Sequence, residues 1–217
     1  MNKIQSTHLP NIGITTTTYT DKELKPILDE VDEIKKDFDN YELVKYNSNL
    51  AGHIKREYSL STSKEHLENL MLPAISQYIN SFNMQNRYAF QGHVEPGTKN
   101  MSVRLENTWV NFQKKHEFNP MHRHGGIISF ALWLQVPYSL SDETKVFPDV
   151  AAYANSSGVF SFHYTNVLGE LTTNVIPVDK TYKNCIVIFP AELNHSVNPF
   201  YTSDDYRISV SGNWVVG

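Results

Sequence analysis

The chain has 217 residues, of which 40% are hydrophobic and 19% charged; this composition is typical of one packed globular domain and excludes a disordered or collagen-like chain. Lys and Arg number 19 against 23 Asp and Glu, so the formal net charge is −4 and we expect no bulk binding of nucleic acid. The single cysteine, the absence of a signal-peptide pattern at residues 1–8 and the absence of an apolar stretch of about 20 residues lead us to expect a cytoplasmic protein that does not enter a membrane.

Two amphipathic helices are predicted in the first half of the chain. Residues 20–23 have the pattern of a capping box, and apolar side chains then recur at helical spacing over residues 24–38. A second apolar stripe of this kind runs over residues 62–82. We expect residues 1–96 to form a helical support region within a single domain that spans residues 1–217.

Residues 97–217 are predicted to be mostly sheet. Short runs rich in Val, Ile, Phe, Trp and Thr alternate there with polar residues and are separated by Pro, Gly, Asn and Asp. The predicted strands are residues 103–113, 127–136, 159–164, 174–178, 185–189, 195–199 and 206–215. Seven or eight strands suit a jelly roll of two sheets, and the turn-rich segment 138–157 is a candidate specificity loop. We therefore expect a mainly β fold with N-terminal helices.

Three histidines are candidate metal ligands. His122 and His124 are separated by one residue, so both imidazoles point to the same side of an extended strand. His195, from a later strand, would complete a face of three nitrogens, and imidazole suits Fe, Zn, Cu and Ni. Nine histidines placed at random in 217 residues would produce roughly 0.4 such pairs. The motif alone therefore also fits histidines that only hydrogen-bond the backbone.

The last predicted strand carries a polar face that starts with an arginine. Arg207, Ser209, Ser211 and Asn213 share one face of that strand, while Ile208 and Val210 lie on the other. If the polar face is solvated, it needs no ligand. If it lines the interior of a sandwich, the guanidinium needs an anion, and a small dicarboxylate suits its planar fork. The same alternation places two further sets of side chains on single faces on either side of the histidine pair: Trp109, Asn111 and Gln113, and then Ser129, Ala131, Trp133 and Gln135.

Four segments in this order resemble a known family. They are WVNFQKKHEFNP (109–120), HRHGG (122–126), FPAELNHSVNPF (189–200) and RISVSGN (207–213). Together they resemble the iron(II)- and 2-oxoglutarate-dependent oxygenases, and within them a branch common in bacteria and marine phages. The resemblance covers residues 100–217, and it implies a double-stranded β-helix, which is a cupin-like jelly roll, over residues 97–217.

The resemblance also implies roles for individual residues. His122 and His195 would be the first and last ligands of Fe(II), and Arg207, with Ser209 beside it, would hold the distal carboxylate of the cosubstrate 2-oxoglutarate. His124 stands where most relatives have Asp or Glu, so the implied centre has three histidines. The candidate walls for cosubstrate and substrate are Trp109, Asn111, Gln113, Trp133 and Asn213.

The implied function is that of a dioxygenase. It would oxidise, in the simplest case hydroxylate, a small-molecule or peptide substrate, with release of succinate and CO₂ from 2-oxoglutarate. A phage-encoded enzyme of this kind would act in the cytoplasm of the host cell. Two alternatives are open: a cupin-type metalloenzyme with three histidines that does not use 2-oxoglutarate, and a non-catalytic jelly-roll binding module.

Overall fold

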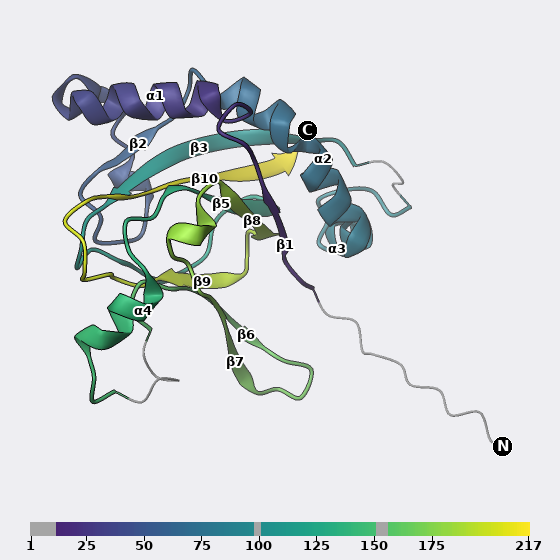
Figure 1. Ribbon diagram of the computed structural model, residues 1–217. Coiled ribbons are helices and arrows are strands. Elements are labelled where there is room, and N and C mark those ends of the chain that lie inside the picture. The colour runs from purple at the N-terminus through teal and green to yellow at the C-terminus, as the bar shows by residue number, and fades with distance from the viewer. Residues whose placement is uncertain (1–11, 98–100, 151–155) are drawn as a thin grey trace.

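The fold consists of two antiparallel β-sheets, with the two long helices on the outer side of one of them (Figure 1). The computed structural model describes residues 12–97, 101–150 and 156–217. The strands are β1 (Thr15–Thr18), β2 (Glu57–Ser59), β3 (Val103–Gln113), β4 (Asn119–His122), β5 (Ile128–Gln135), β6 (Phe160–Thr165), β7 (Leu171–Ile176), β8 (Cys185–Pro190), β9 (Asn194–Val197) and β10 (Arg207–Val216). The helices are α1 (Lys25–Lys36), α2 (Lys64–Ser81), α3 (Met84–Phe90) and α4 (Leu140–Glu143).

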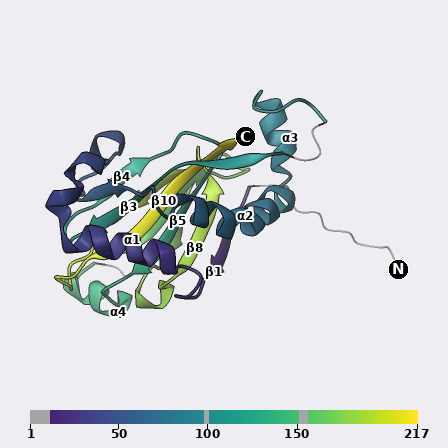
Figure 2. The same cartoon turned by 90° about the horizontal axis from the view of Figure 1, so that it is seen from above.

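The two sheets form a sandwich. The larger sheet has the strand order β1-β8-β5-β10-β3-β2, and the smaller has the order β4-β9-β6-β7. In Figure 1 the larger sheet lies between the smaller sheet and the helices α1 and α2, and Figure 2 shows these two helices crossing over its strands. The expected mainly β fold with N-terminal helices is confirmed. None of the described helices combines the length and the apolar character that a bilayer-spanning helix requires.

Two apolar cores fill the spaces between the layers. The first joins helical side chains such as Ile27 and Ile75 to the outer face of the larger sheet, where Phe112 and Val210 lie. The second contains residues of both sheets and is rich in aromatic rings, among them Trp133. Successive residues of a strand point to opposite faces. Alternate residues of β3, β5 and β10 therefore lie in the helix-side core, and the residues between them lie in the interior of the sandwich.

The helices are held at their starts by carboxylates. The predicted capping box forms, because the backbone N–H of Thr20 donates to the Glu23 carboxylate at 2.7 Å and that of Glu23 donates to Thr20 Oγ1 at 3.2 Å. Glu30, which is buried in α1, accepts the backbone N–H groups of residues 61–63 just before α2. One carboxylate thus binds the backbone that leads into α2 and ties the two helices together.

The predicted strands overlap the observed ones, and the long strand at residues 103–113 coincides with β3. The sequence interpretation missed β1, β2, β4 and α3. These three strands have only three or four residues each, so their partners rather than their own patterns define them. Since β1 and β2 form the two edges of the larger sheet, the first 96 residues contribute strands as well as helices. Within the candidate specificity loop, residues 151–155 lie outside the described residues.

Candidate metal centre

The three candidate ligands converge between the sheets. His122 of β4 and His195 of β9 are register partners on neighbouring strands, and His124 follows two residues after His122. One nitrogen from each ring lies within 4.8 Å of the other two, and the Nε2 atoms of His122 and His124 are 3.2 Å apart. Two imidazoles at right angles on one ion, each about 2.1 Å from it, would have their nitrogens about 3.0 Å apart. His122 and His124 therefore have the spacing of two ligands on one metal ion, and His195 lies near enough to be a third.

The other nitrogen of each ring is held by the protein. Nδ1 of His122 donates to the Pro120 carbonyl at 2.7 Å, and Nδ1 of His195 donates to the Leu193 carbonyl at 2.8 Å. A carbonyl oxygen can only accept, so both rings carry their hydrogen on Nδ1 and turn the Nε2 lone pair toward the shared point. Such contacts fix the tautomer and the orientation of a metal-binding imidazole.

His124 is oriented by a chain of side chains from the larger sheet. Its Nδ1 lies 3.1 Å from both Ser129 Oγ and Asn213 Oδ1, and Ser129 donates to Asn213 Oδ1 at 2.7 Å. The Asn213 amide in turn donates to Asn107 Oδ1 at 3.0 Å. The structure thus places Asn213, a candidate wall residue, directly against a metal-ligand candidate. Sequence reasoning missed Asn107, and the only signal for it was its position at the start of the polar face of β3.

Burial sets the charge state of the cluster. Desolvation is the main cause that lowers the pKa of all three rings, and the neighbouring histidines lower it further for His124 and His195. The pKa of His124 falls to about 4, and that of His195 falls well below its ordinary range. The rings are therefore neutral at pH 7, which is the form that binds metal. Among the described residues no carboxylate joins the cluster, so the ligands leave the charge of a bound cation uncompensated.

Two spaces meet at His122 and His124. One is an enclosed cavity of about 30 Å³, which holds about one water molecule. Its walls include four of the residues singled out from sequence: Asn111, Gln113, Trp133 and Ser209. The other is an open groove of about 310 Å³, which the loop at residues 46–51 and Trp109 line. The metal-binding face thus lies between a closed compartment and an open approach.

Arg207 is buried behind the closed compartment, with 1% of its surface exposed. Its Nε and Nη2 donate to Gln113 Oε1 at 3.1 and 2.6 Å. Its Nη1 donates to Tyr138 OH at 2.6 Å and to the Gly158 carbonyl at 2.7 Å. Its Nη2 also donates to the Asn198 carbonyl at 3.0 Å. All five N–H groups thus have neutral acceptors.

No carboxylate forms an ion pair with Arg207 among the described residues. A buried cation without an anion beside it is unfavourable, so the charge of Arg207 would stabilise an anionic ligand bound there. Arg207 does not itself line the enclosed cavity, and Gln113 stands between the two. The acceptors Tyr138, Gly158 and Asn198 come from segments far apart in the sequence and carried no signal in it.

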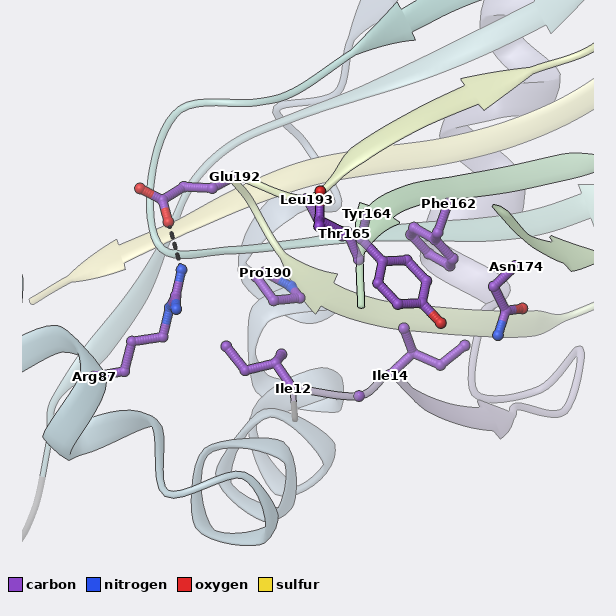
Figure 3. A pocket seen from close by; sticks show the side chains of 11 residues that line it. Ile12, Ile14, Arg87, Phe162, Tyr164, Thr165, Asn174, Pro190, Glu192 and Leu193 are labelled. Carbon is purple, nitrogen blue, oxygen red and sulfur yellow. Dashed lines mark hydrogen bonds and ion pairs between the residues drawn. The ribbon is translucent and has the colours of Figure 1, made fainter. Parts of the chain in front are cut away.

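The remaining titratable groups do not form a second centre in the described part of the chain. A larger cavity of about 360 Å³ lies beside Phe162, on the inner face of the smaller sheet. Figure 3 shows the ion pair of Arg87 and Glu192 at one end of this cavity and Asn174 at the other. The other described histidines bond or stack elsewhere; they are His53, His66, His93, His116 and His163. His8 lies outside the described residues.

The comparisons with known proteins agree with this geometry. Residues 107–213 match the family model described as "Putative 2OG-Fe(II) oxygenase". No curated protein matches the chain by sequence. A prolyl-4-hydroxylase from Pseudomonas putida has a similar structure, with a TM-score of 0.54 and 13% identity over 94% of this chain and 93% of that one. SnoN, a non-heme α-ketoglutarate-dependent epimerase from nogalamycin biosynthesis, gives a TM-score of 0.54 and 12% identity over 94% of this chain and 78% of that one.

At these identities the solved structures establish the fold, and the family match adds the chemistry. Fold and site together define a double-stranded β-helix that carries a candidate metal centre of three histidines. The region that carries the site, residues 107–213, matches the 2OG-Fe(II) oxygenases, a family that uses Fe(II) and 2-oxoglutarate. The donor set of the site fits this cofactor, because three neutral imidazoles bind Fe(II) and still leave coordination positions for other ligands.

Proposed function

We propose that the protein hydroxylates a small-molecule or peptide substrate and converts 2-oxoglutarate to succinate and CO₂. The observation that carries this proposal is the convergence of three imidazole nitrogens close to a buried guanidinium that has no anionic partner among the described residues. Bound Fe(II) would supply the redox chemistry that couples dioxygen and 2-oxoglutarate to C–H oxidation. The protein supplies ligands, orientation and a closed compartment.

His122, His124 and His195 would bind the metal through Nε2. Their Nδ1 contacts keep the rings in place before metal arrives, so little ordering remains to be done on binding. The chain would act as one domain, because α1 and α2 pack on the sheet that carries Arg207 and β1 and β2 extend it.

Arg207 would bind the distal carboxylate of 2-oxoglutarate in place of Gln113. The Gln113 side-chain oxygen takes up both Nε and Nη2, which is the bidentate edge that a carboxylate uses. Gln113 is a side chain that lines the cavity, and its rotation would also break the bond that its amide donates to the Glu117 carbonyl at 2.6 Å, whereas two of the other acceptors are backbone carbonyls that cannot turn away. A cavity of about 30 Å³ also requires some side chain to move before a dicarboxylate enters. Asn111, Trp133 and Ser209 would then form the walls around it.

The substrate would reach the metal through the open groove. The groove contains the rings of Tyr46 and Trp109, which stack with centroids 5.5 Å apart, and it exposes His122 and His124 at its base. A groove open to solvent admits either a small molecule or a segment of peptide, and its aromatic wall offers apolar area for contact.

The test is an anaerobic titration with Fe(II) and 2-oxoglutarate, which should give a visible charge-transfer band, followed by admission of O₂ and assay of succinate. His122→Ala and His195→Ala should abolish both signals. His163→Ala is the matched control, because His163 lies on β6 outside the cluster and bonds Ser196. The band should be weakened strongly in Arg207→Ala.

Three results would contradict the proposal. Absence of both band and succinate argues against an oxygenase of this type. Metal-dependent activity that survives Arg207→Ala indicates a three-histidine enzyme that does not use 2-oxoglutarate. Untagged protein that takes up no stoichiometric metal indicates a binding module.

A further inference from the structure

Two buried oxygen atoms, one in the wall of the enclosed cavity and one behind it, accept no hydrogen bond within the described part of the chain. They are Oε1 of Glu57 and Oδ1 of Asn111, and the two residues are 2% and 6% exposed. A buried acceptor without a partner is unfavourable, and such atoms are few in folded proteins. Two of them in one place require a common explanation.

The two residues face each other across the edge of the larger sheet. Glu57 of β2 and Asn111 of β3 are register partners, so their Cβ atoms are about 5 Å apart and their side chains lie on the same face. The alternate residues Tyr58 and Phe112 belong to the helix-side core. Glu57 and Asn111 therefore point to the cavity side, where Asn111 lines the cavity and Glu57 lies behind it.

The other polar atoms of both side chains are already used. Oε2 of Glu57 accepts from the Asn47 amide at 3.0 Å, and the Asn111 amide donates to the backbone carbonyl and the hydroxyl of Ser209, both at 3.3 Å. Turning the Asn111 amide over would leave that carbonyl facing another oxygen. With Asn111 in its observed orientation, a single hydrogen between the two remaining oxygen atoms would satisfy both of them.

We propose that Glu57 is a neutral carboxylic acid whose Oε1–H donates to Oδ1 of Asn111, and that this bond fixes the Asn111 amide in the wall of the metal cavity. One proton then satisfies both orphan atoms. Glu57 is a positioning residue, because it acts on the cavity through Asn111. It also holds the loop that lines the cavity and the groove, since Asn47 bonds both Glu57 and the Ile54 carbonyl.

The surroundings of Glu57 favour the neutral form. The polar groups that face it are Asn111 on β3 and Asn47 on the preceding segment, both uncharged, and Glu117 after β3, which is negative. The neighbouring cation, Arg56, packs instead on the ring of Phe38, 4.3 Å from its centroid, in the helix-side core. Burial and the charge of Glu117 raise the pKa of Glu57 to about 8.

Ionisation would reverse the hydrogen bond between the two side chains. A Glu57 carboxylate facing Asn111 Oδ1 would repel it, so the amide would have to turn over and offer its N–H₂ to Glu57. That movement would break both bonds to Ser209, which is itself a cavity residue. The cavity wall thus has two hydrogen-bond arrangements, and the pH selects between them.

Infrared spectroscopy tests the protonation state without metal, 2-oxoglutarate or substrate. Wild-type protein at about pH 6 should show the C=O stretch of a protonated carboxyl, and the band should disappear with a midpoint near pH 8. The band should be missing in Glu57→Gln and present in Glu33→Gln, a control on the exposed side of α1. Absence of the band at about pH 6, or its persistence in Glu57→Gln, would overturn the proposal.

Binding of 2-oxoglutarate to the Fe(II) protein, followed by the charge-transfer band, tests the positioning role; this second arm rests on the function proposed above. The Glu57→Gln variant would copy the neutral acid, since its new amide can donate to Asn111 and its new side-chain oxygen can accept from Asn47. Affinity should therefore decline from about pH 6 to about pH 9 in the wild type and lose this dependence in Glu57→Gln. Glu57→Ala should weaken binding about five- to tenfold, as Asn111→Ala does, with no further loss in the double variant.

The two arms separate the possible failures. If Glu57→Gln weakens binding at about pH 6 as much as Glu57→Ala does, the carboxylate charge is required and the proposal is wrong. If the infrared band titrates as described but no variant binds 2-oxoglutarate, the proposed function fails and the neutral Glu57 stands.

Discussion

The two faces of the larger sheet are made by the same strands and carry different chemistry. On β10 the outward residues Ile208 and Val210 are buried in the helix-side core, whereas the inward residues Arg207 and Ser211 are buried among polar groups. On β3 the outward Phe112 is likewise apolar. Each inward polar group then needs its own partner, while the outward groups need only a complementary shape. The helix-side face therefore supplies an apolar core, whereas the inward face combines the polar residues of the site with part of the second apolar core.

This comparison predicts that substitutions on the two faces separate activity from stability. The largest effect is expected from His195→Ala on the inward side. Loss of one of three ligands should lower the affinity for Fe(II) by more than about 100-fold, beyond the effect typical of outer contacts, and abolish succinate formation. Removal of this buried ring, which stacks on Phe160, also lowers the stability of the metal-free protein, so the affinity is measured under conditions in which the variant is folded. Retention of stoichiometric metal in a competition titration would contradict the assignment.

The corresponding outward substitution is Phe112→Ala. This ring is fully buried and contacts the rings of Phe38, Tyr58 and Tyr206, so its removal should lower the free energy of unfolding by about 3–5 kcal/mol. Denaturant unfolding of the metal-free protein measures the loss. Because Phe112 does not line the cavity, the protein that remains folded should bind metal as before. Weaker metal binding with little loss of stability would contradict the prediction that outward residues affect stability and not the metal site.

The division of the larger sheet into an apolar outward face and a polar inward face could be predicted from the sequence only in part. Alternation over eleven residues defined β3 and placed Asn111 and Gln113 on one face. The spacing of His122 and His124 indicated that both bind the same metal ion. The partners were not predictable. Tyr138, Gly158 and Asn198 surround Arg207 from distant segments, and β2, which brings Glu57 to Asn111, is too short to show a period. Local patterns encode the direction of a side chain, whereas its partners depend on the tertiary fold.

A contact behind the metal ligands should have an intermediate effect. Asn213→Ala removes an acceptor from Nδ1 of His124, which leaves Ser129 as the only polar partner of that nitrogen in the described residues. We expect the affinity for Fe(II) to fall about 10- to 100-fold, with the ligand set intact. Asn174→Ala, at the far cavity of Figure 3, is the control and should leave metal affinity as in the wild type. Equal affinities in Asn213→Ala and wild type would show that Ser129 alone orients His124.

Gln113→Glu tests whether 2-oxoglutarate uses the edge of Arg207 that Gln113 occupies. A glutamate at this position would place a carboxylate on the bidentate edge of the guanidinium and compete with 2-oxoglutarate. We expect the affinity for 2-oxoglutarate to fall about tenfold or more, and the metal-free protein to become more stable because the buried cation gains an anion. Gln113→Ala should have the opposite effect on the affinity, since it removes the competing acceptor. Unchanged binding in both variants would show that the cosubstrate does not use this edge.

The smallest expected effect, taken over one pH unit, lies at the sheet edge, where the inward residue Glu57 is buried and has no ion pair among the described residues. Its pKa is raised to about 8 in the folded protein, against about 4.3 in an unfolded chain. The folded state therefore binds the proton more tightly, so stability is fully present below about pH 4.3 and is lost as the pH rises through about 8. Between these limits each pH unit should destabilise the wild type by up to about 1.4 kcal/mol relative to Glu57→Gln, which cannot ionise. Denaturant unfolding at about pH 6 and about pH 7 measures this difference, and parallel pH profiles of the two proteins would show that Glu57 is ionised in the fold.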